Sequence, residues 1–193
     1  MRSLRARLAA LWLILVVSAT VTGFVLIAFY RQSANAQVAR AEELVDRSCR
    51  QLGDRYTSLV SPWRGADTDR VDQDFTRQLT EIAQSALASA PGVEGGIWQA
   101  SRGSLAYAYP TYEGTGPKTD VPEAELATIR SVNDEALRSG RPATVRQVGR
   151  SQVLVVHACP LPRPLAGVTG WTMTRVFTGQ GQAYNQLLSG LGL

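Results

Sequence analysis

The side chains of this chain that could bind a small molecule are aromatic, with a few basic and polar groups between them. Ligand pockets combine apolar walls with a small number of polar anchors, and this set contains both. The aromatic members are Trp98, Tyr107, Tyr109, Tyr112 and Trp171, and the polar members are Lys118, Arg130, His157 and Arg175. Aromatic residues that alternate along a half-buried strand are also typical of core packing. Both interpretations stay open at this stage.

Residues suited to catalysis or to metal binding are few. His157 is the only histidine, and it lies in the apolar run from Val153 to Cys159. That position favours a hydrogen-bonded histidine in a sheet over a ligand contact or a pH switch. No serine has the surroundings of a nucleophile elbow, and no glycine-rich loop ends in Lys-Ser or Lys-Thr. A single histidine and two distant cysteines make a poor zinc site. We therefore expect no catalytic residues, no metal and no cofactor.

The N-terminal segment from Leu8 to Tyr30 carries no charged side chain. As a helix rising ~1.5 Å per residue, it is long enough to cross a hydrocarbon core of ~30 Å. Three arginines, Arg2, Arg5 and Arg7, precede it, and the positive-inside rule places that end in the cytoplasm. The sequence therefore predicts a lipid-spanning helix.

This prediction divides the chain into a cytoplasmic tail (1–7), a transmembrane helix (8–30) and an extracytoplasmic domain (31–186) at a bacterial inner membrane, facing the periplasm. A cleaved signal peptide is the alternative, because Ala34-Asn35-Ala36 resembles a cleavage site. The apolar segment, however, exceeds the ~7–15 residues usual for a signal peptide. We expect the segment to remain as an anchor.

The net charge of +4 does not indicate a nucleic-acid partner. Three of the basic residues belong to the expected cytoplasmic tail, and the rest of the chain is nearly neutral. No basic stripe interleaved with aromatic residues is present, as nucleic-acid binding would require.

Cys49 and Cys159 are the two cysteines of the chain. If both lie in an oxidising compartment, their even number favours a disulfide between them. The alternative is a pair of buried free thiols that pack as small hydrophobic groups. The expected topology favours the disulfide.

The segment from Gln32 to Val60 is expected to form one long amphipathic helix. Apolar residues recur every seven positions along it, with smaller or aromatic residues on the same side. The seven-residue set is Val38, Val45, Leu52 and Leu59, and the additional members are Ala41, Cys49 and Tyr56. This stripe either packs on its own domain or forms a homodimer seam through the Val38–Leu59 helix.

The remainder of the extracytoplasmic domain changes from helical to strand-like periodicity. Expected elements are a helix (68–90), two strands (93–99 and 104–111), a helix (122–139), three strands (143–148, 152–158 and 170–177) and the start of a helical pattern (184–191). Two hairpins around a central helix predict an α+β fold with a five-stranded, mostly antiparallel sheet and helices against one face.

Four short stretches, together with this element order and the N-terminal span, carry a resemblance to a known family. They are Gly96-Ile97-Trp98, the segment from Ala108 to Gly114, the segment from His157 to Pro162, and the segment from Trp171 to Arg175. The whole chain resembles the N-terminal sensing region of a bacterial sensor histidine kinase whose periplasmic domain is PAS-like, of the Cache or PDC type.

The resemblance implies an extracytoplasmic sensor of a two-component system, which detects a small molecule or an envelope signal and passes it through the membrane helix. Such a kinase continues into a second span, a phosphoacceptor helix and an ATP-binding domain, and residues 187–193 would begin that span in a truncated reading frame. Two other classes stay open: a single-pass scaffold of an envelope or secretion machine, and a membrane-tethered hydrolase, which the missing catalytic residues disfavour.

Overall fold

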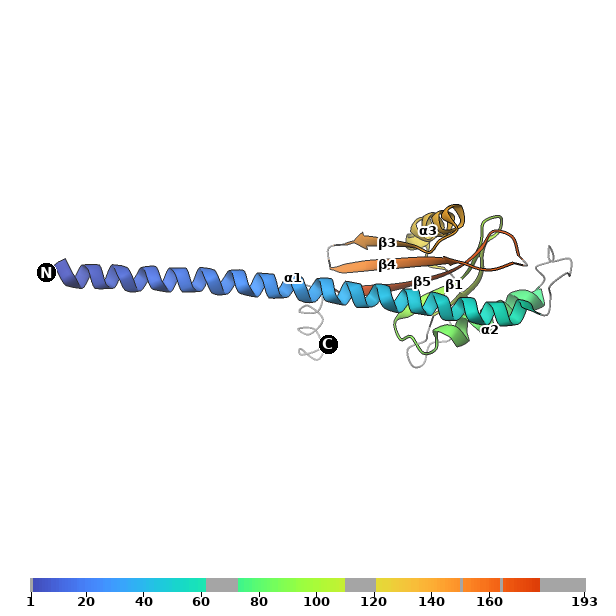
Figure 1. The fold of residues 1–193 in the computed structure, drawn as a ribbon, viewed down its shortest axis with the longest axis horizontal. Helices are drawn as coiled ribbons and strands as arrows, with labels where there is room; N and C mark the ends of the chain where they lie inside the picture. Colours follow the sequence, from blue (N-terminus) through green and yellow to red (C-terminus); the bar gives the residue numbers. More distant parts are fainter. Residues whose placement is uncertain (1, 62–72, 110–120, 150, 164, 178–193) are drawn as a thin grey trace. The chain divides into compact units, whose positions relative to one another are not determined.

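The computed structural model of the chain describes residues 2–61, 73–109, 121–149, 151–163 and 165–177 (Figure 1). Residues 1–37 and residues 38–193 form separate compact units, which are described in turn. Helix α1 (Arg2–Val60) includes the first of these units and the beginning of the second. Expected features at residues 62–72, 110–120 and 178–193 lie outside the described residues.

The first unit is the N-terminal part of α1, and the large apolar side chains that the structure describes between residues 8 and 25 are exposed. They are Leu8, Leu11, Trp12, Leu13, Ile14, Leu15, Val16, Val17, Val21, Phe24 and Val25. The hydroxyls of Ser18, Thr20 and Thr22 donate hydrogen bonds to carbonyls of the preceding helical turn. Among the side chains that the structure describes, no helix meets the length and apolarity needed to cross a membrane.

The second unit is built on one five-stranded sheet, as the sequence predicts. Its strands are β1 (Val93–Gln99), β2 (Gly103–Ala108), β3 (Ala143–Val148), β4 (Gln152–Pro160) and β5 (Val168–Phe177). Their order in the sheet is β2-β1-β5-β4-β3. All four neighbouring pairs are antiparallel, so the expected mostly antiparallel sheet is entirely antiparallel.

Helices pack against both faces of this sheet, whereas the sequence predicts helices against one face. One hydrophobic cluster joins α1 and α2 (Gln73–Leu87) to Val93, Ile97, Val153 and Val155 of the strands. A second cluster joins α3 (Leu126–Ser139) to the opposite face. Because both faces are covered, β1 and β4 are almost entirely buried and lack the polar alternation of a half-exposed strand.

The helices that cover the sheet follow their local signals. In α2, the buried residues Phe75, Leu79, Ala83, Ala86 and Leu87 recur every three or four positions. A short 3-10 turn (Glu123–Glu125) precedes α3. Gly140 follows α3 in the left-handed conformation with a φ of 65°, which ends the helix at little steric cost.

The apolar stripe of α1 packs on its own domain. Val45, Cys49, Leu52 and Tyr56 are fully buried, and Val38 and Ala41 are nearly so. Leu59 is half-buried against the same cluster. The seven-residue repeat is therefore satisfied within one chain, which is the first of the two interpretations above.

Candidate functional site

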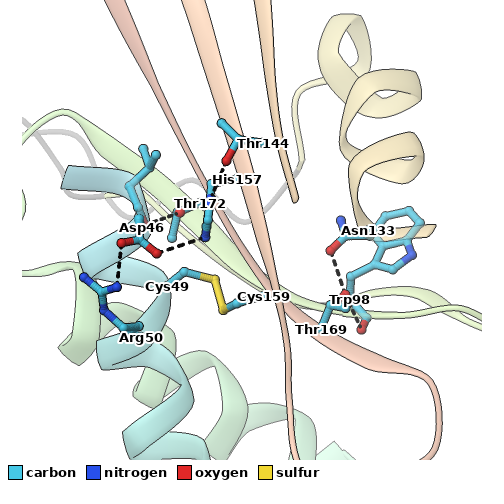
Figure 2. Close-up of a disulfide and its surroundings, with 11 residues drawn as sticks. Asp46, Cys49, Arg50, Trp98, Asn133, Thr144, His157, Cys159, Thr169 and Thr172 are labelled. Atoms are coloured by element: carbon cyan, nitrogen blue, oxygen red, sulfur yellow. Dashed lines mark hydrogen bonds and ion pairs between the residues drawn. A yellow bond between two sulfur atoms is a disulfide. The ribbon is translucent and has the colours of Figure 1, made fainter. Parts of the chain in front are cut away.

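The contact between α1 and the sheet contains the most unusual chemistry of the described residues. A disulfide joins Cys49 of α1 to Cys159 of β4 across 110 positions of sequence (Figure 2). Cys49 is fully buried, and Cys159 is 8% exposed. Gly170 of β5 lies beneath the bridge, where an added Cβ would come within 3.2 Å of Leu52 and 3.3 Å of the Cys159 Sγ. The absence of a side chain at Gly170 thus lets helix and bridge approach the sheet.

His157 lies two residues before Cys159 and faces the same helix. Its Nδ1 is 2.8 Å from the Oγ1 of Thr144, the directly opposite residue on β3. Its Nε2 is 3.5 Å from the Oδ1 of Asp46 on α1, one helical turn before Cys49 (Figure 2). Within the described residues, this nitrogen is buried and has no hydrogen-bond partner.

Burial lowers the pKa of His157, because the charged imidazolium loses water that the surroundings do not fully replace. The carboxylates of Asp46 and Glu42 act in the opposite direction, and Arg50 acts in the same direction as burial. His157 is therefore a neutral group at neutral pH, with its side chain only 5% exposed.

An open cavity of about 740 Å³ lies at this contact. It is lined by Ala39, Glu42, Glu43, Asp46, Thr144, Arg146 and His157. Each of its carboxylates is paired with an arginine: Glu42 with Arg146 through two hydrogen bonds, Glu43 with Arg47, and Asp46 with Arg50. The cavity wall is thus polar and highly charged, yet its charges are matched in pairs.

The aromatic residues singled out from the sequence lie on the other face of the sheet. Trp98, Tyr107 and Trp171 are buried in the cluster under α3. The rings of Tyr107 and Trp171 stack with centroids 5.9 Å apart, and the guanidinium of Arg130 lies 6.0 Å from the ring centre of Trp98. Tyr109 is half-buried against the same cluster. Here the aromatic residues contribute to the core.

The other candidates do not join one site. His157 faces α1, so the sheet separates it from the aromatic cluster. Tyr112 and Lys118 lie outside the described residues. Arg175, one of the polar candidates, binds Glu94 and, at 3.0 Å, Glu125.

Glu94 was not recognised from the sequence. Its side chain is 4% exposed, and it accepts hydrogen bonds from Tyr107 and Arg175. Burial raises the pKa of Tyr107, and the hydrogen bond to Glu94 raises it further. Burial opposes the charge of Arg175, but its bonds to Glu125 and Glu94 prevail and raise its pKa. The one signal in the sequence is that Glu94 places a carboxylate inside an otherwise uncharged strand.

Neither face offers a metal centre within the described part of the chain, where no group of His, Cys, Asp and Glu is placed to hold an ion. On the α1 face, the titratable imidazole of His157 lies next to a covalent link between helix and strand.

The fold defines an α+β domain whose five-stranded antiparallel sheet packs against helices on both faces. Its disulfide is typical of proteins in an oxidising, extracytoplasmic compartment. The chain matches no protein-family model and no curated protein.

Proposed function

We propose that this chain is a membrane-anchored extracytoplasmic sensor domain, of the kind carried by two-component histidine kinases. The observation that carries the proposal is that one helix, α1, contains both the uncharged segment and the residues that bind the sheet. A change in how the sheet holds α1 would therefore act on the same helix that enters the membrane. Rigid-body shifts of such an element are an established way of passing a signal.

The anchor is supported by the exposed apolar residues between Leu8 and Val25. The hydroxyl groups in that segment bond to their own helix, as a lipid environment requires of polar groups. Arg2, Arg5 and Arg7 on the N-terminal side favour a cytoplasmic N-terminus. The Cys49–Cys159 disulfide supports a periplasmic position for the domain.

The sensor role is supported by the element order α–α–β–β–α–β–β–β, which is the order on which the resemblance to PAS-like sensors of the Cache or PDC type rests. The link between sheet and α1 adds a physical route for the signal. A homodimer remains part of this proposal, but the buried stripe of α1 means that other surfaces of the helix would form its seam. If the aromatic residues bind a ligand, that ligand would lie on the face of the sheet that α3 covers.

Topology is tested with reporters fused after Leu193. A phosphatase that folds only in an oxidising compartment should be active there, and a cytoplasmic fluorescent reporter should stay dark. The opposite pattern would overturn the extracytoplasmic assignment.

The sensor role is tested with the DNA downstream of the chain and with a receptor fusion. The proposal expects the downstream DNA to encode a second apolar segment and a kinase region. The whole chain, joined to the second span and kinase core of a characterised receptor, should alter kinase output when Asp46 is replaced by alanine. The exposed helix residue Arg40→Ala is the matched control. Equal output from both variants would favour the single-pass scaffold.

A further inference from the structure

His157 lies in the contact through which α1 is held to the sheet, among the charged side chains that line the cavity there. Its Nε2 is buried, has no hydrogen-bond partner among the described residues, and lies 3.5 Å from Asp46 Oδ1. Its other nitrogen is held by Thr144 at 2.8 Å. The ring is thus fixed in orientation and positioned to receive a proton toward α1.

We propose that His157 is a proton-binding site that controls how firmly the part of α1 before Cys49 is held against β3 and β4. This inference rests on the proposed function for its physiological meaning, because it names acidity outside the membrane as the signal. The chemical step is a simple one: Nε2 gains a proton from solvent, and the ring gains one positive charge.

The groups that face this charge come from three elements. From α1 they are Glu42, Asp46 and Arg50, and from β3 they are Thr144 and Arg146. From β5, Thr172 is the direct neighbour of His157, and its hydroxyl is used in a hydrogen bond to Val45.

These groups do not stabilise the imidazolium fully. Asp46 already binds Arg50 at 2.6 Å, and Glu42 binds Arg146 at 2.6 Å. A protonated His157 must therefore compete for carboxylates that have partners, while its own side chain is only 5% exposed. The open cavity that His157 lines together with Ala39 and Glu43 provides a way to hydrate the ring if α1 moves outward.

The disulfide determines which part of the helix can move. Because Cys49 remains bonded to Cys159, displacement is restricted at that point and beyond it. The segment from Val38 to Asp46 lies on the other side of the bridge, continuous with the apolar part of α1. Protonation should therefore loosen this segment while leaving the rest of the domain folded.

The presence of one histidine makes the first measurement direct. The full chain is labelled with ¹⁵N-histidine, placed in lipid nanodiscs, and its imidazole resonances are followed from pH 8 to pH 4.5. We expect one titration, centred below the value of about 6.5 for a free histidine. Asp46→Asn should move it to lower pH. A titration at or above 6.5 would overturn the proposal.

The second measurement is hydrogen exchange over the same pH range, corrected for the intrinsic dependence of exchange on pH. Peptides from residues 38–48 should exchange faster as pH falls, with the midpoint of the His157 titration, whereas α3 peptides should not. In His157→Gln, which keeps a polar side chain of similar length, this rise should disappear.

If exchange of residues 38–48 rises equally in wild type and in His157→Gln as pH falls, the rise is caused by protonation of carboxylates and the proposal is rejected. If His157 titrates while residues 38–48 remain unchanged, the proton has no mechanical effect and the proposal also fails. The histidine titration and the hydrogen exchange do not depend on which side of the membrane the domain faces. The reporter fusions test that topology, so failure of the proposed function can be told apart from failure of this proposal.

Discussion

The side-chain hydroxyl of Thr172, in β5, donates a 2.7 Å hydrogen bond to the backbone carbonyl oxygen of Val45, in α1. Both residues are fully buried. A short polar side chain of the sheet therefore binds the backbone of the helix, one turn before the disulfide. The contact between α1 and the sheet combines apolar packing, a covalent bridge and a directional bond, which together define how far apart the two elements lie.

Replacing Thr172 by valine should lower the free energy of unfolding by about 1 kcal/mol, the usual net contribution of a hydrogen bond. Valine preserves the shape of threonine, so the loss reports mainly on the bond. Urea denaturation followed by circular dichroism measures it. Thr172→Ser, which keeps the hydroxyl, is the control, and equal loss in both variants would point to packing instead.

Removing the disulfide with Cys49→Ser and Cys159→Ser together should lower the free energy of unfolding by about 2–5 kcal/mol. At ~2–4 °C per kcal/mol for a domain of this size, the melting temperature should fall by several degrees or more. Differential scanning calorimetry gives the shift. Peptide mapping without reductant should recover Cys49 and Cys159 as one linked pair, and quantitative labelling of both thiols would contradict the bridge.

Replacing Arg175 by alanine should destabilise the domain, because it leaves the buried carboxylate of Glu94 without its cation. Arg175 is 28% exposed, so the loss should stay below the ~3–5 kcal/mol typical of a fully buried pair. The double variant Glu94→Gln with Arg175→Met should recover part of the loss. A double-mutant cycle of unfolding free energies measures the coupling, and strictly additive losses would refute it.

The stability of the domain should depend on the protonation of His157. Its folded-state pKa lies below its unfolded value of about 6.5, so the unfolded state binds the proton first. The contribution of neutral His157 is complete above pH 6.5 and is lost as pH falls through the folded pKa. Relative to His157→Gln, wild type should become progressively less stable to urea below pH 6.5. A difference in unfolding free energy between the two proteins that does not change with pH would contradict this prediction.

Two glycine substitutions should have opposite effects. In β1, a Cβ on Gly96 would lie 1.9 Å from the carbonyl oxygen of Ala106, so Gly96→Ala must displace the backbone of β2. We expect the free energy of unfolding to fall by at least the ~1–3 kcal/mol that overpacking usually costs. In α1, the nearest atom to a Cβ on Gly53 is 3.5 Å away, so Gly53→Ala should stabilise the helix by ~0.5–1 kcal/mol. Thermal melts of the two variants compare them directly.

Local patterns in the sequence predict the strands and helices well. The periodicities over 93–99 and 143–148 coincide with the observed strands β1 and β3. The helix expected over 122–139 ends at Ser139, as α3 does. These features depend on the conformations of neighbouring residues, which is why the sequence alone determines them, along with the α+β class and the number of strands.

The partners of these elements depend on contacts between residues far apart in the chain. An apolar stripe shows that a face will be buried, but not whether a second chain or its own sheet will cover it; the tertiary structure places the α1 stripe on the sheet. Likewise, the apolar strand β4 does not reveal that α3 covers the face opposite α1.

The same reasoning explains the outcome for individual side chains. An arginine near aromatic residues suits an anionic ligand, yet the fold brings the carboxylates of Glu94 and Glu125 to Arg175. His157 acquires its lowered pKa from burial against α1, more than a hundred residues earlier. The sequence by itself determined which residues form strands and helices, because short-range backbone and burial preferences are local; only the tertiary structure decided which charges meet, because that depends on the distances that folding creates.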